Sequence, residues 1–326
     1  MSPKISIVVP LFNEAEVFPQ LIARLTRLLD TFQVPTDVVF VDDGSSDDTA
    51  KQMEIISLGD SRFTSVFLSR NFGHQSALSA GLRVATGTEA VFIIDGDLQD
   101  PPELLVDFYK YLQSGYDVVY AIRKKRKEGP IKRLTYRLYY RLQRRLVNVQ
   151  IPVDSGDFSL ISRRAVKILN SLPEDNQYIR GLRSWIGFRQ VGVEYERAKR
   201  ELGDSKYSLR LLLKLALNGI FNFSDLPIRL ITGMGALVMA GSSIYLLSVL
   251  VKKYVYNIVP IGFTAVIASV ILFGGLQLFC FGVLGEYVLR IFFQVKDRPR
   301  FIIRDLITDK QRLIDCSPDK RDMKIL

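Results

Sequence analysis

The chain has 326 residues, 48% of them hydrophobic, and a formal net charge of +10 from 44 lysines and arginines against 34 aspartates and glutamates. This length suffices for one large domain with additions, and the charge indicates an anionic partner: nucleic acid, a membrane surface or a phosphorylated substrate. Two cysteines and a single histidine, His74, argue against a disulfide framework, a zinc site and a histidine-rich metal site. The first residues lead directly into a strand-like run, so we expect no signal peptide and a cytosolic N-terminal domain.

Short apolar runs alternate with stretches of helical periodicity in the first part of the chain. The helical stretches are residues 17–29, a segment after Thr49, and residues 76–85. This alternation predicts a parallel α/β sheet with helices on both faces. In such sheets, ligands bind at the carboxyl ends of the strands. The predicted strands are residues 5–9, 37–41, 63–68, 90–94, 117–121 and 191–195.

Polar residues come directly after the predicted strands. Because the carboxyl ends of parallel strands meet at one edge of a sheet, we expect these residues to form one site. Asp42 and Asp43 are suited to accept hydrogen bonds from a ribose or a base, whereas Ser45, Asp47 and Asp48 are equally well explained as helix caps. The residues at strand ends are Asn13, Asp42, Asp43, Asn71, Asp95 and Asp97.

Asp95 and Asp97 follow an apolar run that is typical of a buried strand, and Gly96 between them permits a sharp turn. Hard carboxylate oxygens suit Mg²⁺ or Mn²⁺, ions that often bridge to substrate phosphates. Gln99 is close enough in the chain to reach the same ion or its water shell. The alternative is an acidic turn that binds no metal. The chain contains neither a Walker-type phosphate loop nor a Gly-x-Gly-x-x-Gly motif after the first strand, which disfavours a nucleotidase and a dinucleotide oxidoreductase.

The later part of the chain has a membrane-like pattern. Residues 131–147 and 207–228 predict basic amphipathic helices at a lipid interface, although 131–147 also fits an ordinary surface helix or an RNA-binding patch. Two uncharged runs, 230–251 and 261–285, predict a transmembrane helical hairpin within 229–290. Flanking basic residues place both ends in the cytosol. We therefore expect an integral membrane protein of the inner or plasma membrane, with a cytosolic catalytic domain (1–206) and a cytosolic tail (291–326).

Four segments in this order resemble family 2 glycosyltransferases of the GT-A fold, which is Rossmann-like with a mostly parallel sheet. They are residues 9–14 (VPLFNE), 41–47 (VDDGSSD), 71–73 (NFG) and 95–102 (DGDLQDPP). More narrowly, the chain is similar to polyprenyl-phosphate glycosyltransferases: the dolichyl-phosphate mannose synthases and the bacterial undecaprenyl-phosphate glucosyltransferase branch. Residues 155–158, 180–188 and 200–207 extend the resemblance, which covers the chain up to about Arg300.

The resemblance implies an inverting transfer of a sugar from a nucleotide donor to a polyprenyl phosphate. UDP-glucose is the expected donor, with GDP-mannose, UDP-N-acetyl sugars and UDP-aminoarabinose derivatives left open. Mg²⁺ or Mn²⁺ is expected at Asp95, Asp97 and Gln99. A homo-oligomer is also expected, because small residues line the predicted membrane helices.

Asp157 stands where the family has its proposed base. A phosphate acceptor has a second pKa of ~6 and needs little proton abstraction, so Asp157 alternatively orients other groups or helps the metal. Arg123, Arg200 and Lys206 are candidates to bind phosphates through charge-assisted hydrogen bonds; Asp97, Arg200 and Lys206 join Asp157 as predicted catalytic residues. The family's nucleoside-binding positions fall on Pro10, Phe12, Glu14, Asp43, Asn71 and Gly73, beside Asn13 and Asp42.

Three other functions compete with this interpretation. A processive polysaccharide synthase would require more membrane helices and a Gln-x-x-Arg-Trp motif, which the residues before Trp185 do not form. A non-catalytic membrane scaffold would not need the Asp95 and Asp97 carboxylates. An RNA-binding protein would show steeply salt-dependent RNA affinity. Interaction with a membrane surface accounts for the positive charge without nucleic acid, so we expect no nucleic-acid partner.

Overall fold

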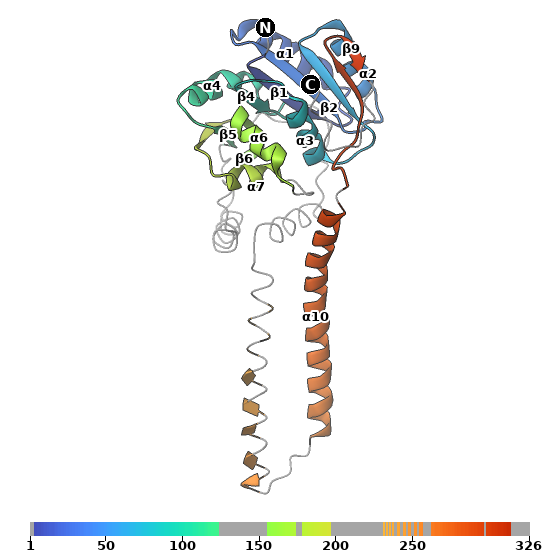
Figure 1. Ribbon diagram of the computed structural model, residues 1–326, viewed down its shortest axis with the longest axis vertical. Coiled ribbons are helices and arrows are strands. Elements are labelled where there is room, and N and C mark those ends of the chain that lie inside the picture. The colour runs from blue at the N-terminus through green and yellow to red at the C-terminus, as the bar shows by residue number, and fades with distance from the viewer. Residues whose placement is uncertain are drawn as a thin grey trace. The chain divides into compact units, whose positions relative to one another are not determined.

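The computed structural model describes residues 3–123, 155–173, 178–196, 262–296 and 298–313, together with individual positions between 231 and 256. The described residues divide into two compact units. The first contains those up to 196 together with 298–313, and its main feature is a β-sheet covered by helices (Figure 1). The second contains those from 231 to 296, including the long helix α10 (Phe263–Val295).

The sheet of the first unit has nine strands, of which the central four are parallel. The expected α/β arrangement is therefore confirmed at the centre. The strands expected at 117–121 and 191–195 are also present and pair parallel with each other, whereas the strands at 155–162 and 303–308, which run antiparallel to the central ones, were not predicted. In spatial order the strands are β7 (Gln190–Tyr195), β5 (Val118–Arg123), β6 (Ser155–Ser162), β4 (Ala90–Ile93), β1 (Ile5–Leu11), β2 (Thr36–Asp42), β3 (Phe63–Leu68), β8 (Ile303–Thr308) and β9 (Gln311–Leu313).

Helices cover both faces of this sheet. Leu21, Met53 and Phe108 belong to one buried cluster with Ile7 of β1. Side chains of successive strand residues point to opposite faces, and Val8 packs instead against α3. Helices α1, α2 and α4 therefore cover one face and α3, which contacts α6, covers the other. The helices are α1 (Phe18–Thr31), α2 (Thr49–Gly59), α3 (His74–Val84), α4 (Leu105–Gln113), α6 (Arg163–Ser171), α7 (Ile179–Trp185) and the 3₁₀ turn η1 (Pro102–Leu104).

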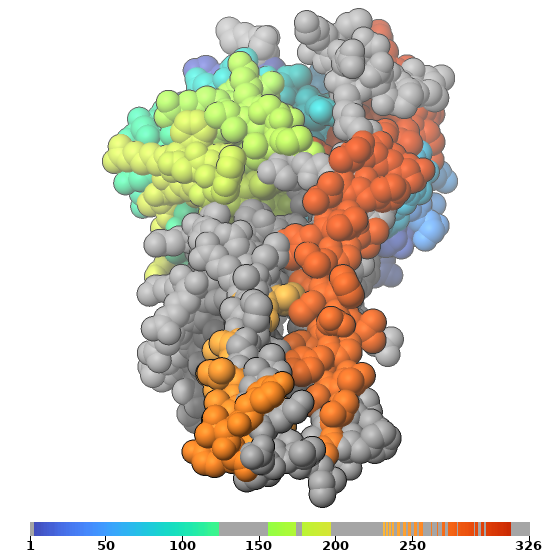
Figure 2. Space-filling model, turned by 60° about the horizontal axis from the view of Figure 1, so that its bottom comes forward, coloured from blue at the N-terminus to red at the C-terminus, as the bar shows by residue number. Residues whose placement is uncertain are grey.

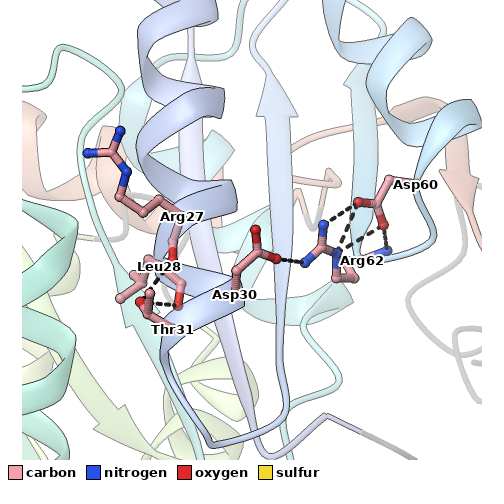
Figure 3. A network of polar contacts seen from close by, with 6 residues as sticks. All are labelled: Arg27, Leu28, Asp30, Thr31, Asp60 and Arg62. Carbon is pink, nitrogen blue, oxygen red and sulfur yellow. Dashed lines mark hydrogen bonds and ion pairs between the residues drawn. The ribbon is translucent and has the colours of Figure 1, made fainter.

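An ion-pair network joins the end of α1 to the start of β3, at the edge of the sheet away from the strands' carboxyl ends (Figure 3). Nη1 of Arg62 donates to Oδ1 of Asp30 at 2.7 Å, and Nη2 donates to Oδ2 of Asp60 at 2.7 Å. These groups are partly exposed, and exposed ion pairs contribute only about 0–1 kcal/mol each. The network therefore orders this end of the sheet rather than supplying much of its stability.

Residues beyond α10 complete the sheet. Strand β8 pairs antiparallel with β3, with Ile307 opposite Ser65, and Ile307 is fully buried. The Ser69 N–H, just after β3, donates to the carbonyl oxygen of Ile302 at 2.9 Å. Part of the segment that the sequence predicted as a tail therefore belongs to the core of the first unit.

The predicted transmembrane hairpin is wrong: among the residues that the structure describes, no helix is both long enough and apolar enough to cross a membrane. Only individual positions of the first predicted span, 230–251, are described. The second span falls in α10, which continues past the predicted end at residue 285 through Glu286 and Arg290 to Val295, so the helix carries charges that the prediction left out. Helix α10 is coloured orange to red in Figure 2.

Several other predictions lie outside the described residues. They are the amphipathic helices at 131–147 and 207–228, together with Arg200 and Lys206. These stay predictions.

Placing β8 in the core leads to a test of stability. We expect Ile307→Ala to lower the free energy of unfolding by about 2–4 kcal/mol, because it removes a fully buried side chain and leaves a cavity. The control is Ile302→Ala, at a side chain that is 37% exposed, which should cost less than about 1 kcal/mol. Urea denaturation of the full chain, followed by circular dichroism, measures both, and equal losses would contradict the buried position of β8.

Candidate active site

The register of the strands brings the candidate residues to one edge of the sheet. Strands β1 to β4 are parallel, so the residues that follow them meet at that edge. Strand β6 runs antiparallel to β4 with Ser159 opposite Ile93, so Asp157 comes level with the residues just after β4. Ile122 lies opposite Ser155, which brings Arg123 to the same edge. The predicted convergence of Asp42, Asp43, Asn71 and Asp95 at one edge is confirmed, and Asp157 and Arg123 join it from neighbouring strands.

Asn13 joins the loops after β1 and β2. The Ser46 N–H donates to its Oδ1 at 2.8 Å, and its own N–H donates to the Ser45 hydroxyl at 2.9 Å. Asn13 has a φ of 54°, a conformation that asparagine tolerates better than most residues. The Glu14 N–H donates to Thr49 Oγ1 at 2.9 Å. These contacts fix the two loops against each other, so Asn13 shapes the site through its neighbours.

Asp47 strengthens the same junction. Its Oδ2 accepts a hydrogen bond from the Ala15 N–H at 3.1 Å, and its Oδ1 accepts one from the Thr49 N–H at 3.0 Å. The residue that precedes α2, Asp48, makes no side-chain capping hydrogen bond. Of the three residues interpreted as possible caps, Ser45 and Asp47 therefore connect the loops. The Ser45 N–H also donates to Oδ1 of Asp42 at 3.0 Å.

Asp43 supports the loop between β3 and α3. Its Oδ1 accepts from the Phe72 N–H at 2.7 Å and its Oδ2 from the Gly73 N–H at 2.9 Å. Burial raises the pKa of Asp43, and these amide donors oppose that rise. Gly44, with a φ of 71°, packs against the backbone of this loop, and a Cβ at this position would be 2.6 Å from the backbone nitrogen of Asn71. The Asp43 carboxylate is thus engaged in holding Phe72 and Gly73, the residues directly after Asn71.

The remaining predicted nucleoside positions lie at the end of β1. Pro10 is a buried residue of this strand, and Phe12 and Glu14 follow it as half-buried loop residues. The structure therefore brings the predicted nucleoside positions to the ends of β1 and β2 and to the loops after β1, β2 and β3.

The loop after β4 carries the predicted metal ligands. Oδ1 of Asp95 is buried and has no hydrogen-bond partner, and Oδ1 of Asp97 accepts from the Gln99 N–H at 3.1 Å. Leu98 has a φ of 57°, which is unusual for a leucine and marks local strain. Burial raises the pKa of Asp95 to about 6, with His74 opposing the shift.

A metal at this loop would depend on ligands from outside the chain. In the part of the chain that the structure describes, no group of three or more His, Cys, Asp or Glu side chains is arranged to hold a metal ion. Mg²⁺ commonly uses one or two carboxylates and takes its other ligands from water and substrate phosphates. The buried oxygen of Asp95, which has no hydrogen-bond partner, fits such a partial site beside Asp97.

Asp157 lies at the start of β6 among hydrogen-bond donors from two helices. Its Oδ2 accepts from Nε2 of Gln75 at 3.1 Å and from Nη2 of Arg180 at 3.4 Å, and it lies 3.6 Å from Nε2 of His74. His74 also lies 3.7 Å from Oδ1 of Asp95. This histidine therefore stands between the carboxylate at the base position and the metal loop.

The charged groups of this cluster shift one another's pKa values. Burial alone would raise the pKa of Asp157, but Arg180, His74 and Arg183 together hold it well below its usual range. Burial alone would lower the pKa of His74, but its contacts with Asp157 and Asp95 raise it to about 9. Asp157 is therefore ionised, and His74 carries a proton at neutral pH.

Arg183 is the most unusual of the buried groups. Its side chain is fully buried, Nη1 donates to the Gly156 carbonyl oxygen at 3.4 Å, and Nε and Nη2 have no hydrogen-bond partner. Its guanidinium lies 5.1 Å from the ring centroid of Tyr120, and burial lowers its pKa to about 10. Arg123 also reaches Gly156. Buried charges are normally paired, so open donors here indicate a place for an anion.

Aromatic side chains support β6 from the opposite face of the sheet. The ring centroid of Phe158 is 5.4 Å from those of Phe92 and Tyr195 and 5.5 Å from that of Phe108. The Tyr195 hydroxyl donates to Asp100. Because neighbours in a strand point to opposite faces, this packing of Phe158 directs Asp157 toward α3 and α7.

Four residues of the cluster were missed or misjudged from the sequence. His74 was used only to exclude a histidine-rich metal site, and no role was predicted for Gln75, Arg180 or Arg183. They lie on α3 and α7, which the chain brings beside β6 by long-range packing. The available signal was the position of His74 and Gln75 just after the 71–73 segment and of Arg180 and Arg183 within the 180–188 segment.

The chain is similar to known proteins over nearly its whole length. "Glycosyl transferase family 2" matches residues 6–169. "Uncharacterized glycosyltransferase YkcC" of Bacillus subtilis is 40% identical over 300 residues, covering 92% of this chain and 93% of that protein. "SfII prophage-derived bactoprenol glucosyl transferase" of Shigella flexneri is 38% identical, covering 92% and 97%. "Prophage bactoprenol glucosyl transferase homolog" of Escherichia coli is 36% identical, covering 92% and 98%. The chain is therefore a glycosyltransferase and belongs to glycosyltransferase family 2.

Proposed function

We propose that the protein transfers glucose from UDP-glucose to a polyprenyl phosphate, with inversion at the anomeric carbon and release of UDP. Relatives named bactoprenol glucosyl transferase, 38% and 37% identical to this chain, support this choice of sugar and acceptor. The structural observation that carries the proposal is one cluster that joins a buried carboxylate oxygen and buried guanidinium nitrogens, none of which has a hydrogen-bond partner. Asp95 provides the first and Arg183 the second. Such a cluster suits a substrate that brings both phosphate and a divalent ion.

Asp95 and Asp97 would hold Mg²⁺ or Mn²⁺, with Gln99 near enough to reach the water shell. When bound, the ion neutralises charge on the departing diphosphate. The protein's own contribution is to fix the two carboxylates: Gln99 donates its N–H to Asp97, and Oδ1 of Asp95 is buried without a hydrogen-bond partner, 3.7 Å from Nε2 of His74. Donor binding and metal binding should therefore strengthen each other.

Arg180, Arg183 and Arg123 are proposed to bind substrate phosphates. Charge-assisted hydrogen bonds to an ionised phosphate are roughly twice as strong as neutral ones. A phosphate would also compensate the buried charge of Arg183, whose Nε and Nη2 have no partner in the protein. The predicted phosphate ligands Arg200 and Lys206 remain part of the proposal.

Asp157 is proposed to orient these cations rather than to remove a proton. A carboxylate whose pKa is held far below neutrality is a weak base. The acceptor phosphate, with a second pKa of ~6, is already mostly ionised at neutral pH. Asp157 instead holds Arg180 and His74 through Oδ2.

The acceptor also determines where the reaction takes place. Its lipid tail remains in the bilayer while its phosphate lies at the headgroup level, and nucleotide sugars are cytosolic. We propose that the catalytic unit works at the cytosolic face of the membrane. A homo-oligomer is part of the same proposal, and a monomeric mass in detergent would count against it.

The function is tested directly with a panel of donors. Purified full-length protein is incubated with undecaprenyl phosphate, Mg²⁺ or Mn²⁺, and labelled UDP-glucose, GDP-mannose, a UDP-N-acetyl sugar or a UDP-aminoarabinose derivative. We expect lipid-linked product from UDP-glucose in preference to the others. Preference for another donor would correct the sugar, and the absence of product with every donor would refute the proposed function.

Substituting the metal loop should separate metal binding from folding. We expect Asp95→Asn and Asp97→Asn each to reduce transfer about 100- to 1,000-fold, because each removes a charged oxygen ligand for the ion. Mn²⁺ binding, followed by electron paramagnetic resonance, should weaken in parallel. Asp107→Asn, at an exposed carboxylate of α4, is the matched control and should change neither quantity. Unaltered Mn²⁺ affinity in both loop variants would contradict the assigned ligands.

A further inference from the structure

Gln75 connects three parts of the site through one side-chain amide. It is the second residue of α3, directly after the loop that contains Asn71 and Gly73. Its Nε2 donates to Oδ2 of Asp157 at 3.1 Å, and its Oε1 accepts from the Ile179 N–H at 2.9 Å. Because the amide has a donor end and an acceptor end, these two contacts determine its orientation.

The contact with Ile179 fixes the start of α7. Ile179 is the first residue of this helix, and the first N–H groups of a helix have no partner within it. Tyr178, which precedes the helix, makes no side-chain capping hydrogen bond, so Gln75 supplies an acceptor from another helix. Arg180 and Arg183 both lie on α7. Gln75 thereby fixes the start of the helix that carries both guanidinium groups.

The contact with Asp157 fixes the carboxylate. Oδ2 has three neighbours, and the 3.1 Å contact with Gln75 is shorter than those with Arg180 and His74. Oδ1 is buried and has no hydrogen-bond partner. Holding Oδ2 through a neutral donor keeps the carboxylate from turning to engage Arg180 with both oxygens, a geometry that arginine favours.

We propose that Gln75 is a positioning residue for the transfer step, which holds Asp157 and the start of α7 so that Arg180 and Arg183 face the substrate phosphates. This inference rests on the proposed function. Without the amide, Asp157 and Arg180 pair more closely and the guanidinium turns away from the substrate. Donor binding is affected little, because Asp43 holds the nucleoside loop independently.

Two substitutions at Gln75 test the contacts of the two ends of the amide separately. Gln75→Ala removes both contacts. Gln75→Glu keeps an oxygen that accepts from Ile179 but places a carboxylate, instead of a donor, against Asp157. Gln20→Ala is the matched control, because Gln20 is an exposed glutamine on α1. The kcat and the KM for UDP-glucose are measured for each full-length variant, together with its melting temperature.

We expect Gln75→Ala to lower kcat about 10- to 100-fold with the donor KM changed less than about threefold, as a misplaced reacting group does. Gln75→Glu should be at least as impaired, and Gln20→Ala should match the wild type. The inference is overturned if Gln75→Ala keeps its kcat within twofold. It is also overturned if Gln75→Glu is as active as the wild type, which would mean that only the contact with α7 matters. A third contradicting result is a change in kcat and donor KM together with a lower melting temperature. Wild-type protein that transfers no sugar from any donor refutes the proposed function, and this inference with it.

Discussion

A single carboxylate oxygen organises the candidate site. Oδ2 of Asp157 lies within 3.6 Å of groups from His74, Gln75 and Arg180, so that one atom links α3, β6 and α7. Placing cations in a protein interior is unfavourable unless an opposite charge is close. Asp157 supplies one negative charge, while Arg183 remains buried with open N–H groups. The surplus positive charge is what an incoming phosphate would balance.

The sheet explains why these groups meet. Parallel strands β1 to β4 deliver the nucleoside loops and the Asp95 loop to one edge. The antiparallel strand β6 then returns to the same edge with Asp157, and Phe158 packs against aromatic rings on the opposite face. Several polar side chains of the loops form hydrogen bonds with other loop residues: Asn13, Asp43 and Asp47 hold the loops in place in this way. Among the described residues, the buried atoms without a hydrogen-bond partner include Oδ1 of Asp95, Oδ1 of Asp157 and nitrogens of Arg123, Arg180 and Arg183.

Features that depend on local sequence patterns could be predicted, whereas features that depend on contacts between residues far apart in the chain could not. The β-branched runs and the carboxylates after them were sufficient to place the central strands and the Asp95–Asp97 loop, because both are local patterns. Gln75, Arg183 and β8 could not be placed, since their roles depend on partners far away in the chain: Gln75 contacts Ile179, and Ile307 lies opposite Ser65. The hairpin prediction is wrong, because no helix among the described residues is both long enough and apolar enough to cross a membrane; α10 extends past the predicted span through Glu286 and Arg290.

The central claim is that the Asp95 loop binds the diphosphate of a nucleotide donor together with a divalent ion. Calorimetric titration of UDP into the full-length protein, with Mn²⁺ and with a chelator, tests it most directly. We expect UDP to bind at least tenfold more tightly with Mn²⁺, because Asp95 and Asp97 attract the diphosphate only through the ion. Equal affinity in the two conditions would contradict it.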